Sequence, residues 1–270
     1  MEALGTNPKP DGAMAVPGQP EPRVRRAWPW RLARRLAFGV PVLVTLVVIA
    51  NWLWLLSGSN RWELKTDRDG VQIYTMKTPG SPVLKVHGSA RFKEFSLSNH
   101  IAPLLDEGIQ NPTDCAKWVT GCLGYRILQP WNARTQRNVT LWTMALFPPF
   151  SPREMLLQGQ LHQDPKTRVV TLENISAPNL LPPDDCCVRI EHLHNIWRYT
   201  PQPDGSIQVD VQYDLDMGGA FPQLLQNLHA PDIVFELLST DIPKLLRQPK
   251  YRNTHLALID EGNAAAAARP

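Results

Sequence analysis

The last long run of periodic apolar positions, residues 216–246, predicts a long amphipathic helix. Its apolar residues recur at steps of three, four and seven: Leu224, Leu228, Phe235, Leu238, Ile242 and Leu245. Gly218 and Gly219 allow a sharp turn before it, and Pro222 suits a first helical turn, where its missing N–H is not needed. Pro231 and Pro243 interrupt the run, so we expect a kink near each proline.

The stretch between residues 62 and 216 has mostly the pattern of short strands. Alternation and turn residues delimit strands over residues 71–74, 83–92, 125–131, 137–147, 155–162, 169–175, 188–199 and 207–215. Two short helices are expected over 95–107 and 113–119. Connections this short join antiparallel neighbours, and the apolar stripe of the long helix needs cover. The pattern therefore predicts an α+β fold with a helix laid across an antiparallel sheet.

An uncharged apolar stretch, residues 36–56, precedes this region. About twenty apolar residues suffice for a helix to cross a bilayer. Trp52 and Trp54 close its far end, and Trp28 and Trp30 precede its near end, as interface anchors do. A cleaved signal peptide and a buried core helix are both less favoured, because the stretch is long and has no small-residue cleavage site. We expect a single-pass transmembrane helix.

The positive charge of the chain lies at its beginning. The formal net charge is +3, and the first 35 residues hold Lys9 and six arginines against three acidic residues. The folded part therefore has no basic surplus, which argues against a nucleic-acid partner. Basic residues before a membrane helix stay on the cytoplasmic side. We expect the N-terminus in the cytoplasm, the helix in the inner (cytoplasmic) membrane, and the C-terminal domain in the periplasm or, in a eukaryote, a lumenal space.

Several spaced signatures occur in one order along residues 61–250. They are Trp62, the strand Asp69-Gly70-Val71-Gln72-Ile73-Tyr74, Cys115-Ala116-Lys117-Trp118-Val119, Pro148-Pro149-Phe150-Ser151-Pro152-Arg153-Glu154, Val188-Arg189, Trp197, Pro201, Asp204-Gly205 and Asp216-Met217-Gly218-Gly219-Ala220-Phe221-Pro222. This series resembles the START lipid-transfer domain family. It departs from the family at Glu154, where an aspartate is usual, and at Met217, where a proline is usual.

The resemblance implies a helix-grip fold, in which a curved antiparallel sheet wraps around a long C-terminal helix. It also implies a tunnel between the sheet and the helix that holds one lipid or other apolar molecule. The strand over residues 155–162 permits this, because its apolar residues alternate onto one face and Gly159 would leave room. A filled core would show the same alternation. The expected lipid-binding residues are Met155, Leu157, Gly159, Leu161, Arg189, Glu191, Leu224, Leu228, Phe235, Leu238 and Ile242.

Charged residues in the strand over 188–199 leave two interpretations open. Arg189 and Glu191 alternate with Leu193 and Trp197, and a buried charge needs a partner. Arg189 with Glu191 or Glu173 could then bind the polar head of a lipid. Equally, Arg189 and Arg153 could pin loops at the surface.

The cysteines form two local pairs. A continuous helix would hold the Cα atoms of Cys115 and Cys122 about 10 Å apart, too far for a disulfide. Gly121 suggests that the helix has ended, so we favour a Cys115–Cys122 bridge in an oxidising compartment. Cys186 and Cys187 are expected to be two separately buried thiols, and a bridge between the two pairs stays open.

The sequence offers no convincing catalytic group. His192 and His194 share a strand face, which fits a metal pair less well than a solvated face. A Gly-x-Ser-x-Gly elbow and a glycine-rich phosphate loop are both missing. We therefore expect no catalytic residue, metal or cofactor. The alternatives are a cyclase- or hydrolase-like enzyme that uses the same cavity, and a packed scaffold that binds a protein.

The predicted organisation has five parts. Residues 1–35 form a disordered basic segment, 36–56 the membrane helix, 57–61 a linker, 62–250 a START-like domain and 251–270 a flexible tail. The expected function is to bind, and to carry, a hydrophobic molecule next to the membrane. Pro231, Pro243 and the Gly218-Gly219 turn are the expected hinges for its entry.

Overall fold

The computed structural model describes residues 28–109 and 112–262 of the 270-residue chain. The predicted disorder of the N-terminal segment concerns residues that lie mostly outside these ranges. By its contacts the chain divides into two compact units at residue 50. Helix α1 (Trp28–Leu56) is the one described helix that is long and apolar enough to cross a membrane, over Gly39–Leu56. The predicted boundaries of the membrane segment and the linker remain predictions.

Residues 51–270 form the second unit, which is built on one large sheet. In its described part, ten strands form the sheet in the order β1-β2-β3-β10-β9-β7-β6-β5-β4, with β8 beside β6. The strands are β1 (Glu63–Arg68), β2 (Val71–Lys77), β3 (Leu84–Phe92), β4 (Cys122–Asn132), β5 (Arg137–Met144), β6 (Arg153–Gln163), β7 (Val170–Ser176), β8 (Val188–Arg189), β9 (Leu193–Pro201) and β10 (Ile207–Leu215). All paired strands are antiparallel except β6 and β8. The predicted antiparallel sheet is confirmed.

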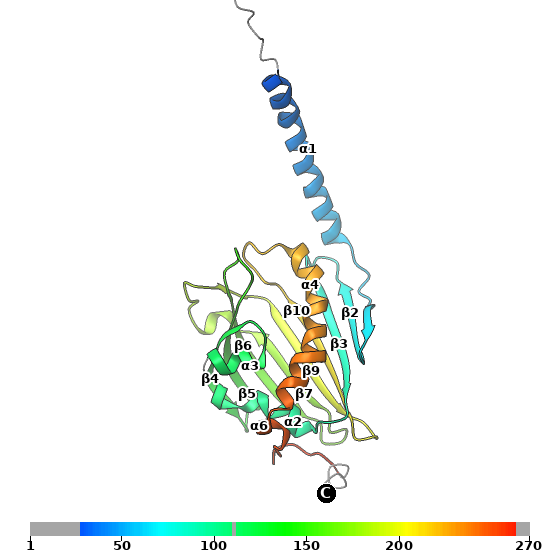
Figure 1. Cartoon of the computed structure of the whole chain (residues 1–270), viewed down its shortest axis with the longest axis vertical. Helices are drawn as coiled ribbons and strands as arrows, with labels where there is room; N and C mark the ends of the chain where they lie inside the picture. Colours follow the sequence, from blue (N-terminus) through cyan, green and yellow to red (C-terminus); the bar gives the residue numbers. More distant parts are fainter. Residues whose placement is uncertain (1–27, 110–111, 263–270) are drawn as a thin grey trace, which may run out of the picture. The chain divides into compact units, whose positions relative to one another are not determined.

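The C-terminal helix lies across one face of this sheet (Figure 1). It comprises α4 (Gln223–Glu236), a π-helical turn η4 (Leu237–Asp241) and α5 (Ile242–Leu246), and α6 (Pro249–Arg252) follows. The α-helix runs through Pro231, whereas the π turn ends at Asp241, two residues before Pro243. A proline has no N–H to donate, and such wide turns mark weak points of a helix. The α+β helix-grip prediction is confirmed.

Smaller helices complete the domain around the ends of the sheet. They are α2 (Leu97–Ile101), η1 (Pro103–Leu105), η2 (Glu107–Ile109), α3 (Pro112–Trp118) and η3 (Pro178–Leu180). Ser96 begins α2 with a capping box, in which its hydroxyl accepts from the Asn99 N–H and the Asn99 side chain accepts from the Ser96 N–H.

The buried face of the long helix differs from the predicted stripe. Leu224 and Leu228 are 69% and 59% exposed, so their placement toward the sheet is wrong. The inward face follows Gln226, Val234 and Leu238, with Ala230 partly buried between them. The cause is polar: the Gln226 amide donates to the Leu215 carbonyl and accepts from the Met217 N–H at 3.1 Å, which turns this side of α4 inward.

A glycine in β3 allows the helix to approach closely. A Cβ added to Gly88 would lie 2.6 Å from Leu238 Cδ1 and 2.7 Å from Val234 Cγ1. Such separations are too short for carbon atoms, so only glycine fits here. The main core cluster forms around this contact and includes Ile73, Val86 and Leu97.

The predicted flexible tail is wrong for residues 251–262. Tyr251 and Ile259 are 2% and 4% exposed, and both belong to core clusters. The Glu261 carboxylate accepts from the N–H groups of Leu97 and Ser98 at the start of α2, where a negative charge is favourable. Residues 263–270 lie outside the described part of the chain.

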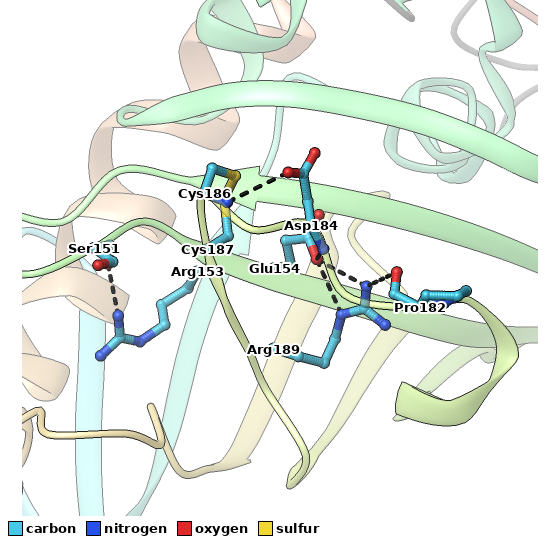
Figure 2. The surroundings of a disulfide bond; sticks show 8 residues. All are labelled: Ser151, Arg153, Glu154, Pro182, Asp184, Cys186, Cys187 and Arg189. Atoms are coloured by element: carbon cyan, nitrogen blue, oxygen red, sulfur yellow. Dashed lines mark hydrogen bonds and ion pairs between the residues drawn. A yellow bond between two sulfur atoms is a disulfide. The ribbon is translucent and has the colours of Figure 1, made fainter.

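Both local cysteine pairs are disulfides. Cys115–Cys122 is confirmed: α3 ends at Trp118, and the positive φ of Gly121 bends the chain so that the two Cα atoms are 5.7 Å apart. The expectation of two buried thiols at Cys186 and Cys187 is wrong, since they form a disulfide with each other (Figure 2). They lie in the loop between η3 and β8, where Cys186 is exposed and has no core to enter.

Candidate functional site

A cavity of about 230 Å³ lies between the sheet and the C-terminal helix. Strands β5, β6, β7, β9 and β10 supply one wall, and η4, α5, η1 and α3 contribute to the other. Most of the lining is apolar, and large aromatic side chains recur in it: Trp118, Trp142, Trp197, Tyr199 and Tyr213. Among the described residues that line it, none is Asp, Glu, Lys or Arg.

Alternation along β6 identified part of this lining. Met155 and Leu157 line the cavity, as does Ile242 from α5. Leu161 and Leu238 lie instead in the packed core beside the cavity. Phe235 also packs against this core, with the Arg68 guanidinium 4.1 Å above its ring. The cavity is therefore displaced from the predicted stripe toward the C-terminal end of the helix.

Gly159 does not leave an empty space. A Cβ at this position would collide with Asn138 Oδ1 and would lie 2.8 Å from Asn174 Oδ1. Two neighbouring amide side chains thus occupy the room that the glycine provides. The prediction that Gly159 enlarges the cavity is therefore wrong.

The two charged residues predicted for the site lie elsewhere. The expected strand over residues 188–199 is divided: Val188 and Arg189 form β8 beside β6, and β9 begins only at Leu193. This break ends the predicted alternation, so that Leu193 and Trp197 line the cavity while Arg189 does not. Glu191 is exposed in the connecting segment.

The expected lipid contacts included no residue of β9 or β10, although the sequence placed Leu193 and Trp197 on one strand face. Asn195, Trp197 and Tyr199 share the inward face of β9, and Tyr213 and Leu215 share that of β10. Their spacing of two residues along each strand was the available signal. His192 and His194 do not line the cavity; they contact the carboxylates of Asp214 and Glu173 at 2.9 Å and 2.6 Å.

A buried histidine borders the cavity. The His100 ring lies 5.4 Å from the Phe92 ring and 5.5 Å from the Tyr199 ring, centroid to centroid. Its Nδ1 lies 2.9 Å from the Ser96 carbonyl oxygen, and its Nε2 has no hydrogen-bond partner among the described residues. Burial lowers the pKa of His100 to about 4, although the Ser96 carbonyl and the Glu261 charge oppose this.

The cavity is electrically neutral at pH 7. Burial raises the pKa of Tyr199 and of Tyr213, so both phenols keep their protons. His100 is uncharged, because its pKa lies well below 7. The polar groups of the lining can therefore act only as hydrogen-bond donors and acceptors.

Comparisons with known proteins place this architecture. No protein-family model matches the sequence. The crystal structure of a STAR-related lipid transfer protein from Xanthomonas axonopodis has a TM-score of 0.59 and 21% identity, and the match covers 69% of this chain and 99% of that one. Human STARD10 gives 0.61 and 14%, over 74% and 79% of the two chains. Human StAR-related lipid transfer protein 5 gives 0.57 and 16%, over 78% and 98%. The chain has the START fold.

The sequence is also similar to that of an uncharacterized protein from Pseudomonas aeruginosa, over a comparable part of the chain. It is 23% identical over 197 residues, which cover 70% of this chain and 91% of the relative. The matched length corresponds to a START-fold domain rather than to a short motif.

The Arg153-Glu154 dipeptide of this START-fold domain is buried at the start of β6. The Arg153 guanidinium donates to the carbonyl oxygens of Ser151, Met217 and Gly218, at 2.6, 2.7 and 3.2 Å. It thus fixes the turn that leads into α4. Glu154 accepts from Arg189 at the other side of the strand (Figure 2). The pair organises loops, and neither residue lines the cavity.

Proposed function

We propose that the domain binds one hydrophobic small molecule, such as a lipid, in the cavity between the sheet and the C-terminal helix. The observation that carries the proposal is the cavity itself, with its apolar and aromatic lining and no Asp, Glu, Lys or Arg among its described residues. Apolar surface transferred from water into such a site gains about 25 cal/mol per Å² before the costs of binding. The START fold, shared with lipid transfer proteins, supports the same conclusion by analogy.

Entry of the ligand requires one wall to move. The π turn η4 lies next to the cavity, because its first residue Leu237 and the first residue of α5, Ile242, both line it. The Ile242 N–H donates to the Leu237 carbonyl, five residues back instead of four, and Pro243 has no N–H to donate, so this is where the helix bends at least cost. The Gly218-Gly219 turn, in which both glycines have positive φ, supplies a second hinge before α4. Opening at these hinges would allow the molecule to be carried to and from a bilayer.

We also propose that the domain works next to a membrane, outside the cytoplasm. Helix α1 supports an anchor by its length and composition, and the basic residues before it favour a cytoplasmic N-terminus. Disulfides persist in oxidising compartments, which fits a periplasmic or lumenal domain. Protease added to the non-cytoplasmic side of intact cells or vesicles should digest the domain, and protection of the domain would reverse this topology.

Binding without catalysis fits the lining better than an enzyme does. A cyclase or hydrolase needs an acid, base or nucleophile at the reacting atoms. His100 is the titratable imidazole among the described lining residues, and it is already bonded to a backbone carbonyl. A fully packed scaffold is disfavoured by the cavity.

The test is to purify the full-length chain and measure the extracted lipids by mass spectrometry. We expect an apolar molecule at near one-to-one stoichiometry. Leu157→Trp fills the cavity from β6, so this variant should purify without the molecule. Ile175→Trp changes an exposed side chain of β7 and should purify with it. Protein that carries no ligand and binds none from a lipid panel, or a filled variant that retains full stoichiometry, would refute the proposal.

A further inference from the structure

A row of polar side chains crosses the inner face of the sheet. Asn138 in β5 is the direct register partner of Gly159 in β6, and Gly159 is the partner of Asn174 in β7. Asn174 is in turn paired with Asn195 in β9, and Asn195 with Tyr213 in β10. Directly paired residues point to the same face, so these side chains form a line perpendicular to the strands.

Specific contacts hold the side chains of this row in place. The glycine in its middle admits the amides of Asn138 and Asn174 from both sides. Asn174 Nδ2 donates to Asn195 Oδ1 at 2.8 Å, which fixes the orientation of both amides. Asn195 is 6% exposed, although amides are costly to bury without partners.

Three members of the row, Asn174, Asn195 and Tyr213, line the cavity. Asn195 uses its oxygen for Asn174, which leaves its Nδ2 as a donor. Within residues 28–109 and 112–262, neither this Nδ2 nor the Tyr213 hydroxyl donates to a protein acceptor. Burial of the Tyr213 ring keeps the hydroxyl protonated. Two neighbouring strands therefore present two donors to an otherwise apolar space.

We propose that the Asn174-Asn195-Tyr213 row is a polar subsite that selects an uncharged lipid by one oxygen atom. The oxygen, from a hydroxyl or a carbonyl group, accepts hydrogen bonds from Asn195 Nδ2 and the Tyr213 hydroxyl. This inference rests on the proposed function, because it specifies which ligands the cavity takes. Selectivity arises because an analogue without the oxygen shields both donors from water and offers neither an acceptor.

The same lining excludes charged head groups from the interior. A phosphate or carboxylate inside the cavity would have no Lys or Arg beside it, since none occurs among the described lining residues. Burying an unpaired charge costs far more than burying a neutral oxygen. The nearby guanidinium groups of Arg153 and Arg189 are already bonded to backbone carbonyls and to Glu154.

The experiment uses the full-length chain in phosphatidylcholine nanodiscs with four photoreactive probes. Each has the same diazirine-bearing alkyl chain, ending in a hydroxyl, a methyl ester, a hydrocarbon or a phosphate. Labelled peptides are identified and quantified by mass spectrometry. We expect the alcohol or the ester to label cavity peptides at least about fivefold more than the hydrocarbon, the gain of one or two hydrogen bonds. The preferred probe also tells a hydroxyl from a carbonyl ligand, and the phosphate should label least.

Matched variants assign the effect to the row. Tyr213→Phe removes one oxygen atom, and Asn195→Leu keeps the number and branching of the side-chain heavy atoms while it removes the donor, so each should reduce labelling by the preferred probe toward the hydrocarbon level. Labelling by the hydrocarbon itself should not change. Tyr74→Phe is the control, because the Tyr74 hydroxyl bonds Gln72 away from the cavity.

Three outcomes would overturn the inference. Equal labelling by hydrocarbon, alcohol and ester would mean that water satisfies the row, and the proposed function would stand. Strongest labelling by the phosphate probe would show that the cavity takes charged lipids. Absence of cavity labelling by every probe would refute the inference and the proposed function together.

Discussion

Glu154 and Arg189 form an ion pair of 2.8 Å whose side chains are only 5% and 7% exposed. The two residues are register partners in β6 and β8, so the backbone places them opposite each other. The Arg189 guanidinium also donates to the carbonyl oxygens of Pro178, Leu181 and Pro182 (Figure 2 shows the last). One buried cation thus holds the whole loop between β7 and β8 against the sheet.

Breaking this ion pair should be costly. Glu154→Leu leaves Arg189 buried without its counter-charge, and we expect a loss of about 3 kcal/mol in the free energy of unfolding. Arg189→Met should cost a similar amount, and the double variant less than the sum of the two. Denaturant unfolding followed by circular dichroism measures all three.

An exposed pair provides the comparison. Glu63 and Lys65 lie 3.0 Å apart with side chains 64% and 46% exposed, so Glu63→Leu should cost less than about 1 kcal/mol. Equal costs for the exposed and the buried pair, or additive costs within the buried pair, would show that Glu154 and Arg189 are not coupled.

Gly88→Ala should displace the C-terminal helix from β3. Its methyl group would overlap Leu238 Cδ1 and Val234 Cγ1, and overpacking of this kind costs about 1–3 kcal/mol. Leu238→Val, which shortens the facing side chain, should recover part of that loss when combined with Gly88→Ala. The measurement is the shift of the unfolding midpoint. Additive losses in the double variant would contradict a direct contact.

The two disulfides should differ in their contribution to stability. Cys115–Cys122 closes a short loop of the unfolded chain, and replacing both residues by serine should cost about 2–3 kcal/mol. Cys186–Cys187 joins neighbours in the sequence and restrains the unfolded chain far less, so its double serine variant should lose less.

Reductant should also act on the two bridges in order. Cys186 is exposed, whereas Cys115 and Cys122 are 0% and 4% exposed. Alkylation under mild reduction, read by peptide mass spectrometry, should modify Cys186 and Cys187 first. Earlier modification of Cys115 would contradict the burial of the α3–β4 bridge.

The buried histidine predicts a pH dependence of stability. The pKa of His100 is about 4 in the folded chain and near 6.5 when exposed, so the unfolded chain binds a proton first as the pH falls. Stability is therefore lost between about pH 6.5 and 4, by about 2 kcal/mol at pH 5. The nearby Glu261 charge and the Ser96 carbonyl reduce this effect but do not reverse it.

His100→Gln removes this titration and should flatten the slope between pH 7 and pH 5. Burial opposes ionisation of Asp106, Asp210 and Asp214, but their hydrogen-bond partners and neighbouring charges outweigh it and lower their pKa values, so these groups destabilise the fold only at still lower pH. The difference between wild type and variant therefore isolates His100. Parallel curves would mean that the imidazole is accessible to protons in the folded state.

Periodicity in the sequence was enough to predict the architecture, but not which side of the helix faces inward. It identified the antiparallel strands and the long helix, because these follow from local alternation. Leu224 and Leu228 continue the apolar stripe, yet Gln226 is inside because its amide bonds the backbone after β10. A hydrophobicity pattern gives no sign that a glutamine will find such partners.

The cavity was only partly predictable for a related reason. Met155 and Leu157 follow from alternation on one strand, whereas the polar row exists only through the register of five strands. An asparagine inside a strand reads as unfavourable until its neighbours across the sheet are known. Likewise, nothing local in residues 251–262 indicates that Glu261 meets the start of a distant helix.

The position of β10 has a consequence for how this protein is made. This strand is last in the sequence, yet it joins β3 to β9, pairing Phe92 with Ile207. During synthesis, the strands before it can form only two separate half-sheets with open edges. The two half-sheets can join only when residues 207–215 leave the ribosome, and the helix that covers the sheet is synthesised later still. Folding must therefore wait for almost the entire domain, and a chain that stops before residue 207 is an aggregation hazard.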